Sequence, residues 1–82
     1  MARMKFGSLD PSLLGAFFRV RRQARGMSQE ALARSLSVSR RQLGQVETGY
    51  SLPSLETFAA LCEALDVDPG EALRTTRRKQ GS

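Results

Sequence analysis

The feature that most constrains the fold is a pair of short helical patterns with only three residues between them. The first pattern covers residues 28 to 35 and starts at a serine that can act as an N-cap. The second covers residues 39 to 48 and starts at a serine followed three positions later by glutamine, the spacing of a capping box. So short a connection forces two helices to cross at a steep angle, which predicts a helix-turn-helix. The connecting residues are Leu36, Ser37 and Val38.

Cap, proline and glycine signals predict three further helices around this pair. One covers about 11 to 25, between an Asp-Pro start and a glycine stop. Another covers about 54 to 65, where apolar residues recur at helical spacing, and the last starts at a second Asp-Pro pair and runs through Leu73. No segment shows a strand pattern, so we expect an all-α, five-helix domain. The predicted organisation is a flexible N-terminal arm at 1–9, the domain at 10–75 and a flexible basic tail at 76–82.

Charge is strongly segregated along the chain. Residues 1 to 46 hold nine basic against two acidic side chains, whereas residues 47 to 73 hold six acidic side chains and no Lys or Arg. The last nine residues add four basic groups. Such an arrangement predicts one surface that faces a polyanion and another that faces away from it. Arginine outnumbers lysine, which favours forked contacts to phosphate and guanine.

Composition argues against catalysis and cofactors. The chain has no histidine, no cysteine pair and no glycine-rich phosphate loop, so we predict no enzyme activity, no metal and no cofactor. Its single cysteine, Cys62, falls in an apolar helical pattern that predicts a buried thiol. No apolar run is long enough to cross a membrane, and we expect a cytoplasmic protein, associated with the nucleoid when bound to DNA.

Several segments together resemble the Cro and phage-repressor family, also called Xre-like. The resemblance covers about residues 15 to 73 and includes both helices of the motif, their flanks and the fourth helix. It implies a lambda-repressor-like fold that binds double-stranded DNA. The matching segments are Gly26-Met27-Ser28-Gln29-Glu30-Ala31-Leu32-Ala33, Val38-Ser39-Arg40-Arg41-Gln42-Leu43, Glu47-Thr48-Gly49, Leu52-Pro53-Ser54-Leu55 and Ala64-Leu65-Asp66-Val67.

The resemblance implies that the second motif helix lies in the major groove. Its base-reading candidates agree with the chemistry of the groove, because arginine can fork onto guanine and glutamine onto adenine. Arg41 and Gln45, four residues apart, share one face of the helix. By position the base-reading candidates are Arg40, Arg41, Gly44 and Gln45.

Two further groups of residues follow from the matched positions. Arg22 and Glu47 are expected to form a structural ion pair between the first helix and the end of the recognition helix. Phosphate contacts are expected near helix starts, where backbone N–H groups and the helix dipole attract anions. Simple N-capping is the alternative for the serines. The phosphate candidates are Ser28, Gln29, Thr48, Ser51 and Ser54.

The chain departs from the family pattern at three places. In a loop where the family is often basic it has Tyr50 and Ser51, so the alternative phosphate contacts are Arg19, Arg25, Arg34 or the termini. Ser37 stands where the turn usually has glycine, so a left-handed residue is expected there at some cost. Gly44 stands inside the recognition helix, where glycine is unfavourable. This glycine either permits close approach of the helix backbone to DNA or is a neutral sequence change that the fold tolerates.

The expected function is that of a sequence-specific transcriptional regulator, an autoregulating repressor acting as a dimer on a palindromic operator. One such module reads only a few base pairs, so two copies are expected. One alternative is an antitoxin that binds a toxin protein with the same fold; another is a nonspecific nucleic-acid binder that uses the basic ends, including Arg3, Lys5 and Arg77-Arg78-Lys79. The candidates for the dimer surface, which could instead complete the monomer core, are Leu52, Leu55, Val67, Ala72 and Leu73.

Overall fold

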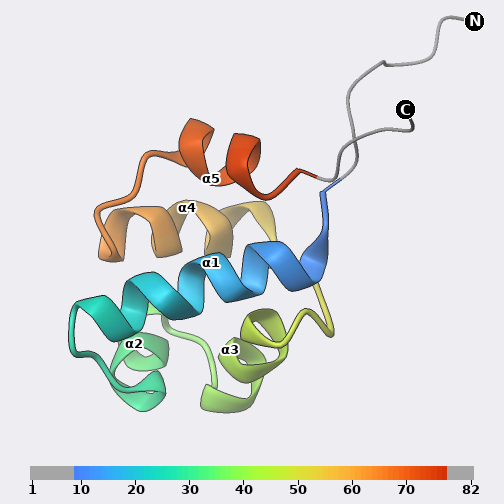
Figure 1. Ribbon diagram of the computed structural model, residues 1–82. Coiled ribbons are helices and arrows are strands. Elements are labelled where there is room, and N and C mark those ends of the chain that lie inside the picture. Colours follow the sequence, from blue (N-terminus) through green and yellow to red (C-terminus); the bar gives the residue numbers. More distant parts are fainter. Residues whose placement is uncertain (1–8, 78–82) are drawn as a thin grey trace, which may run out of the picture.

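The computed structural model describes residues 9 to 77, which form five α-helices (Figure 1). This confirms the all-α, five-helix prediction for that part of the chain, and the observed ends lie close to the predicted ones. None of the helices in the described range is both long and apolar enough to cross a membrane. The helices are α1 (Pro11–Ala24), α2 (Gln29–Leu36), α3 (Arg40–Glu47), α4 (Leu55–Ala64) and α5 (Pro69–Thr75).

A side-chain cap precedes each helix, which explains why local sequence signals located the starts. The Asp10 carboxylate accepts hydrogen bonds from the backbone N–H groups of Ser12 and Leu13 at the start of α1. At α5 the Asp68 carboxylate accepts the N–H of Glu71. The caps satisfy N–H groups that have no carbonyl partner within the helix. The five capping residues are Asp10, Ser28, Ser39, Ser54 and Asp68.

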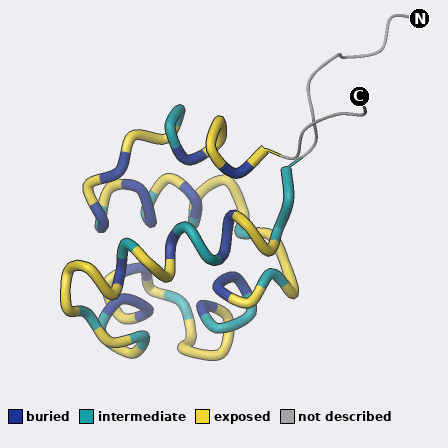
Figure 2. The backbone as a smooth tube through the Cα atoms, in the orientation of Figure 1, coloured by how far each residue is buried: buried dark blue, intermediate teal, exposed yellow. Residues whose placement is uncertain are grey.

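In the view of Figure 1, α2 and α3 lie on one side of α1 and α4 and α5 lie on the other. The buried segments turn inward from all five helices toward a shared core (Figure 2). Phe18 of α1 is fully buried and packs edge-on against Phe58 of α4, with 5.8 Å between ring centroids. Cys62 is buried in the same core, as predicted, and burial together with the nearby Asp68 charge raises the pKa of its thiol.

The domain extends beyond the predicted boundaries at both ends. Leu9 and Arg77 form an antiparallel bridge, and the Asp10 N–H donates to the Thr76 carbonyl at 3.2 Å. Thr76 is buried, and its hydroxyl donates to the Ala72 carbonyl at 2.6 Å. Assigning Leu9 to a flexible arm and Thr76 and Arg77 to a flexible tail was therefore wrong. The rest of both predicted segments, with Arg3, Lys5, Arg78 and Lys79, lies outside the described residues.

Two of the predicted dimer residues belong to the monomer core instead. Val67 is 7% exposed and Ala72 is fully buried, so neither offers surface to a second copy. The reason is that the turn after α4 brings α5 back onto the core, and the Val67 N–H donates to the Cys62 carbonyl at 2.8 Å. Leu52, Leu55 and Leu73, by contrast, are 50%, 83% and 40% exposed.

Candidate nucleic-acid interface

The helix α3 has two contrasting faces. Leu43, Val46 and Glu47 are buried against the rest of the domain. On the other side Arg40 and Arg41 are exposed, and Gly44 and Gln45 are partly exposed. With 3.6 residues per turn, these four positions fall together on the outer side of the helix. The structure therefore brings all four base-reading candidates onto one accessible face.

A capping box holds the start of α3 next to the two arginines. The Ser39 hydroxyl accepts the Gln42 backbone N–H at 3.0 Å, and the Gln42 side-chain oxygen accepts the Ser39 N–H at 2.9 Å. The reciprocal bonds satisfy two N–H groups at a helix end. The first turn, which carries Arg40 and Arg41, is thus held at its backbone while both side chains project outward.

The charges of Arg40 and Arg41 are not neutralised within the domain. Neither side chain has an ion pair in the part of the chain that the structure describes. Four other arginines contact carboxylates within 4.0 Å, whereas Arg40 and Arg41, like Arg19 and Arg25 of the first helical segment, have no such contact among the described residues. Exposed, unpaired guanidinium groups at the start of a helix are suited to bind a polyanion. The paired arginines are Arg21, Arg22, Arg34 and Arg74.

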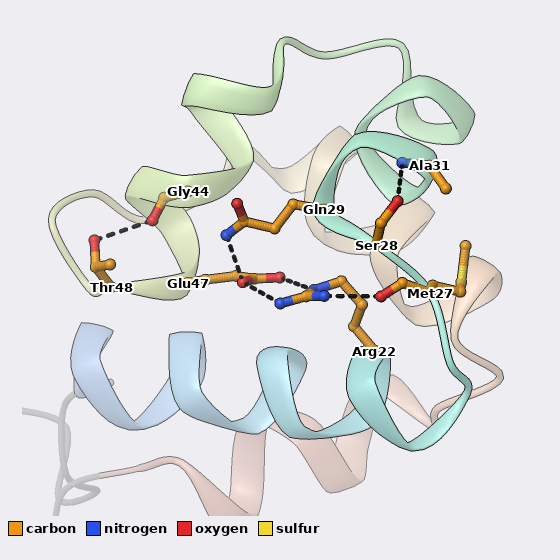
Figure 3. Close-up of polar contacts among 8 residues, drawn as sticks. All are labelled: Arg22, Met27, Ser28, Gln29, Ala31, Gly44, Glu47 and Thr48. Atoms are coloured by element: carbon orange, nitrogen blue, oxygen red, sulfur yellow. Dashed lines mark hydrogen bonds and ion pairs between the residues drawn. The ribbon is translucent and has the colours of Figure 1, made fainter.

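On the inner side of α3, Arg22 and Glu47 form the expected ion pair (Figure 3). The Arg22 Nε donates to Glu47 Oε2 at 2.6 Å, and Nη2 donates to Oε1 at 3.1 Å. The remaining Nη1 donates to the Met27 carbonyl at 2.8 Å. The side chains are 10% and 1% exposed, so the forked geometry compensates for the loss of hydration.

Sequence reasoning missed the third member of this network, Gln29. Its Nε2 donates to Glu47 Oε1 at 2.9 Å, which connects the first residue of α2 to the last residue of α3 (Figure 3). The two motif helices are therefore held at a defined angle by one buried carboxylate. A polar residue eighteen positions before Glu47 carries no local signal of such a contact, because the pairing depends on how the helices pack.

The other phosphate candidates lie at two helix starts and in the segment between α3 and α4. The Ser28 hydroxyl accepts the Ala31 N–H at 3.0 Å, and the Ser54 hydroxyl accepts the Thr57 N–H at 3.1 Å. Both serines therefore act as caps, as the alternative reading expected, and the first N–H groups of each helix stay available to an anion. Thr48 and Ser51 are exposed. The Thr48 hydroxyl donates to the Gly44 carbonyl at 3.0 Å.

The turn between the motif helices has the left-handed residue that was expected. Ser37 has φ 58° and ψ 38°, the region that favours glycine. Its N–H donates to the Arg34 carbonyl at 3.2 Å, and the Val38 N–H donates to the Ala33 carbonyl at 3.0 Å. The two bonds close the end of α2 and direct the chain into α3.

Comparison with known proteins also identifies a helix-turn-helix domain in this chain. Residues 13 to 76 match a family described as a helix-turn-helix domain. The ImmF control region 10 kDa protein of Bacillus phage phi105 is 32% identical over 60 residues, which is 73% of this chain and 67% of that protein.

Two solved structures of regulators are similar to most of the helical domain. The restriction-modification controller protein C.AhdI from Aeromonas hydrophila is 38% identical, with a TM-score of 0.72 over 77% of this chain and 96% of its own. The P22 c2 repressor, solved with a synthetic operator, is 31% identical, with a TM-score of 0.71 over 74% of this chain and 92% of its own. These relatives are regulators rather than enzymes. The chain therefore belongs to the Xre-like helix-turn-helix family of DNA-binding transcription regulators.

Proposed function

We propose that this protein represses its own gene by binding, as a homodimer, to a palindromic operator with α3 in the major groove. The observation that carries the proposal is the outer face of α3, where Arg40 and Arg41 are exposed and without an ion pair among the described residues. The inner face of the same helix is held by a buried ion pair. A rigid helix with free arginines is what direct reading of base edges requires.

Each outer residue has a role that follows from its chemistry. Arg41 is placed to donate a fork to guanine O6 and N7, and Gln45, one turn later, to pair with adenine N6 and N7. Arg40 lies beside them at the helix start, where guanine and phosphate are both within its chemistry. The starts of α2 and α4, capped by Ser28 and Ser54, supply backbone N–H groups for phosphates on either side.

Support for a dimer comes from an exposed apolar surface formed by the segment between α3 and α4, the start of α4 and α5. Leu52, Leu55 and Leu73 border an apolar hollow that also includes Leu9 and Phe58. Large apolar side chains gathered in this way usually mark a contact surface. A second copy seated here gives two recognition helices, which suits a palindrome whose half-sites lie about 34–36 Å apart.

The dimer surface is tested by Leu55→Glu, which places a charge on its most exposed leucine. We expect the dissociation constant of the dimer, measured by sedimentation equilibrium, to rise by at least about tenfold, because a charge would be buried in an apolar contact. The matched control, Val20→Glu, changes an exposed apolar residue of α1 outside the hollow. Equal effects of the two substitutions would place the dimer contact elsewhere.

The regulatory part of the proposal draws on the named relatives. One is a control-region protein of a phage, another a restriction-modification controller and a third a repressor. A repressor of its own promoter needs no more than a DNA-reading domain whose operator occupancy rises with protein concentration. We therefore expect the operator to lie at the promoter of the protein's own gene.

The decisive experiment is selection from a random duplex library at physiological salt, with the wild type beside an Arg40→Ala, Arg41→Ala double variant. A palindromic motif enriched by the wild type alone supports the proposal. No motif from the wild type would overturn it and favour the antitoxin or the nonspecific alternative. Co-purification with a partner protein would then point to the antitoxin.

A further inference from the structure

The glycine at position 44 has no structural reason within the domain. Among the described glycines only Gly26 and Gly49 have positive φ, so the backbone at Gly44 suits any residue. A Cβ added at Gly44 would meet only the Gln29 side-chain nitrogen, at 3.9 Å, which is ordinary contact. Glycine is nevertheless among the least favourable residues inside a helix. Contacts among the described residues therefore do not explain why this eight-residue helix has a glycine at position 44.

Because Gly44 has no side chain and an added Cβ would meet only Gln29, a methyl-sized space is open at this position of α3, and we call this space the recess. Arg40 lies one turn before Gly44 and Thr48 one turn after it. Gln29, at the start of α2, is the neighbour that a Cβ at Gly44 would meet (Figure 3). Gly44 is partly exposed, so the recess opens on the same side as Arg41 and Gln45.

The recess offers no free hydrogen-bonding group from Gly44. Its carbonyl accepts both the backbone N–H and the hydroxyl of Thr48, each at 3.0 Å. Its N–H lies inside the helix, where the carbonyl four residues earlier accepts it. The Gln29 Nε2 uses one of its two N–H groups on Glu47. The floor of the recess is therefore the Cα and its hydrogens, and a small apolar group is what complements it.

The major groove presents one apolar group on its base edges, the C5-methyl of thymine. From this match we infer that the recess at Gly44 receives the C5-methyl of a thymine in each operator half-site. The inference rests on the proposed binding of α3 in the major groove, and it gives Gly44, one of the base-reading candidates, a defined chemical group that its missing side chain would admit. Gly44 then selects thymine by shape, whereas Arg41 and Gln45 select their bases by hydrogen bonds.

The test uses the selected operator with each thymine replaced in turn by deoxyuridine, which lacks only the methyl group. For the wild type we expect one thymine per half-site at which the replacement lowers the affinity for the operator roughly fourfold. This is the change in affinity that corresponds to burying one methyl-sized group. For Gly44→Ala we expect weaker binding to the thymine operator and recovery on the operator with deoxyuridine at that position. The new Cβ would then occupy the space of the missing methyl. The other thymines of the operator are the matched controls.

Thermal unfolding separates a DNA effect from a folding effect. Gly44→Ala should raise Tm by about 4–8 °C, because alanine favours the helix and meets no neighbour closely. A stabilised variant that binds the thymine operator less tightly supports the recess. If the wild type selects an operator but no thymine replacement couples to Gly44→Ala, this inference is overturned and the proposed function stands. If no operator is selected at all, the proposed function itself fails.

Discussion

The two faces of α3 differ in what their residues must satisfy, and two glycines show the difference most directly. A Cβ at Gly15 of α1 would lie 2.2 Å from the Val46 carbonyl oxygen and 2.6 Å from that of Glu47, on the inner side of α3. A Cβ at Gly44, on the outer side, would meet nothing closer than 3.9 Å. Glycine at position 15 is thus required by packing between helices, while glycine at position 44 is not.

The comparison teaches that inner and outer residues of one helix serve separable properties. Inner residues join α3 to α1 and α2 through carbonyl contacts and a buried ion pair, and they set the stability of the domain. Arg40 and Arg41 on the outer face have no ion pair among the described residues, and we propose that the outer residues determine DNA affinity. Substitutions on the inner face should therefore lower the free energy of unfolding, whereas removing an exposed arginine side chain from the outer face should change binding alone.

The largest expected effect is that of Glu47→Ala on the inner face. Removing the carboxylate leaves the Arg22 guanidinium buried without its partner, and breaking such a pair costs about 3–5 kcal/mol of unfolding free energy. Urea denaturation measures the loss. The control is Glu30→Ala, which removes an exposed pair with Arg34 and should cost about 0.5 kcal/mol or less. Similar losses of unfolding free energy in the two variants would show that the ion pair on the inner face of α3 contributes no more to stability than an exposed one, which would contradict the comparison.

Gly15→Ala should be the next most damaging change. Its Cβ would overlap backbone oxygens of α3, which cannot rotate away, so α1 and α3 must separate, at a cost of about 1–3 kcal/mol. Thermal unfolding beside Gly44→Ala compares the same substitution in two helices. We expect Tm to fall for the first and to rise for the second. A rise for both would mean that the close approach of α1 to α3 relaxes easily.

On the outer face, Arg41→Ala should weaken operator binding by about 1–3 kcal/mol and relax the preference at one base position. Its unfolding free energy should match that of the wild type, because the side chain is exposed and has no ion pair among the described residues. Arg25→Ala, at the end of α1, should weaken binding to every sequence alike. Binding isotherms on operator and random duplexes measure both. Equal loss on the two duplexes for Arg41→Ala would contradict a base-reading role.

The smallest expected effect is that of Ser37→Gly, in the turn between the two motif helices. Glycine removes the cost of the left-handed conformation and should stabilise the domain by about 1 kcal/mol. Because the turn belongs to neither face of α3, operator affinity should stay unchanged. A change in affinity without a change in Tm would show that the turn itself takes part in DNA contact.

Local chemistry made a large part of the protein predictable from sequence. The helix starts follow from side-chain caps that act within three residues, as at Ser39 and Gln42. The outer face of α3 follows from helical spacing, whereas the left-handed conformation of Ser37 was expected from the family pattern at that position. The expected pair of Arg22 and Glu47 came from the family resemblance, since the residues are far apart in the chain.

The sequence by itself determined which residues start each helix and which side of α3 is polar, because both depend on neighbours within one or two turns. Only the tertiary structure decided that Gln29 binds Glu47, that Val67 and Ala72 are buried, and that Leu9 pairs with Arg77. It also decided that Gly15 is needed and Gly44 is free. The physical reason is that these contacts join residues from different elements, and no local pattern specifies the distance between two helices until they pack.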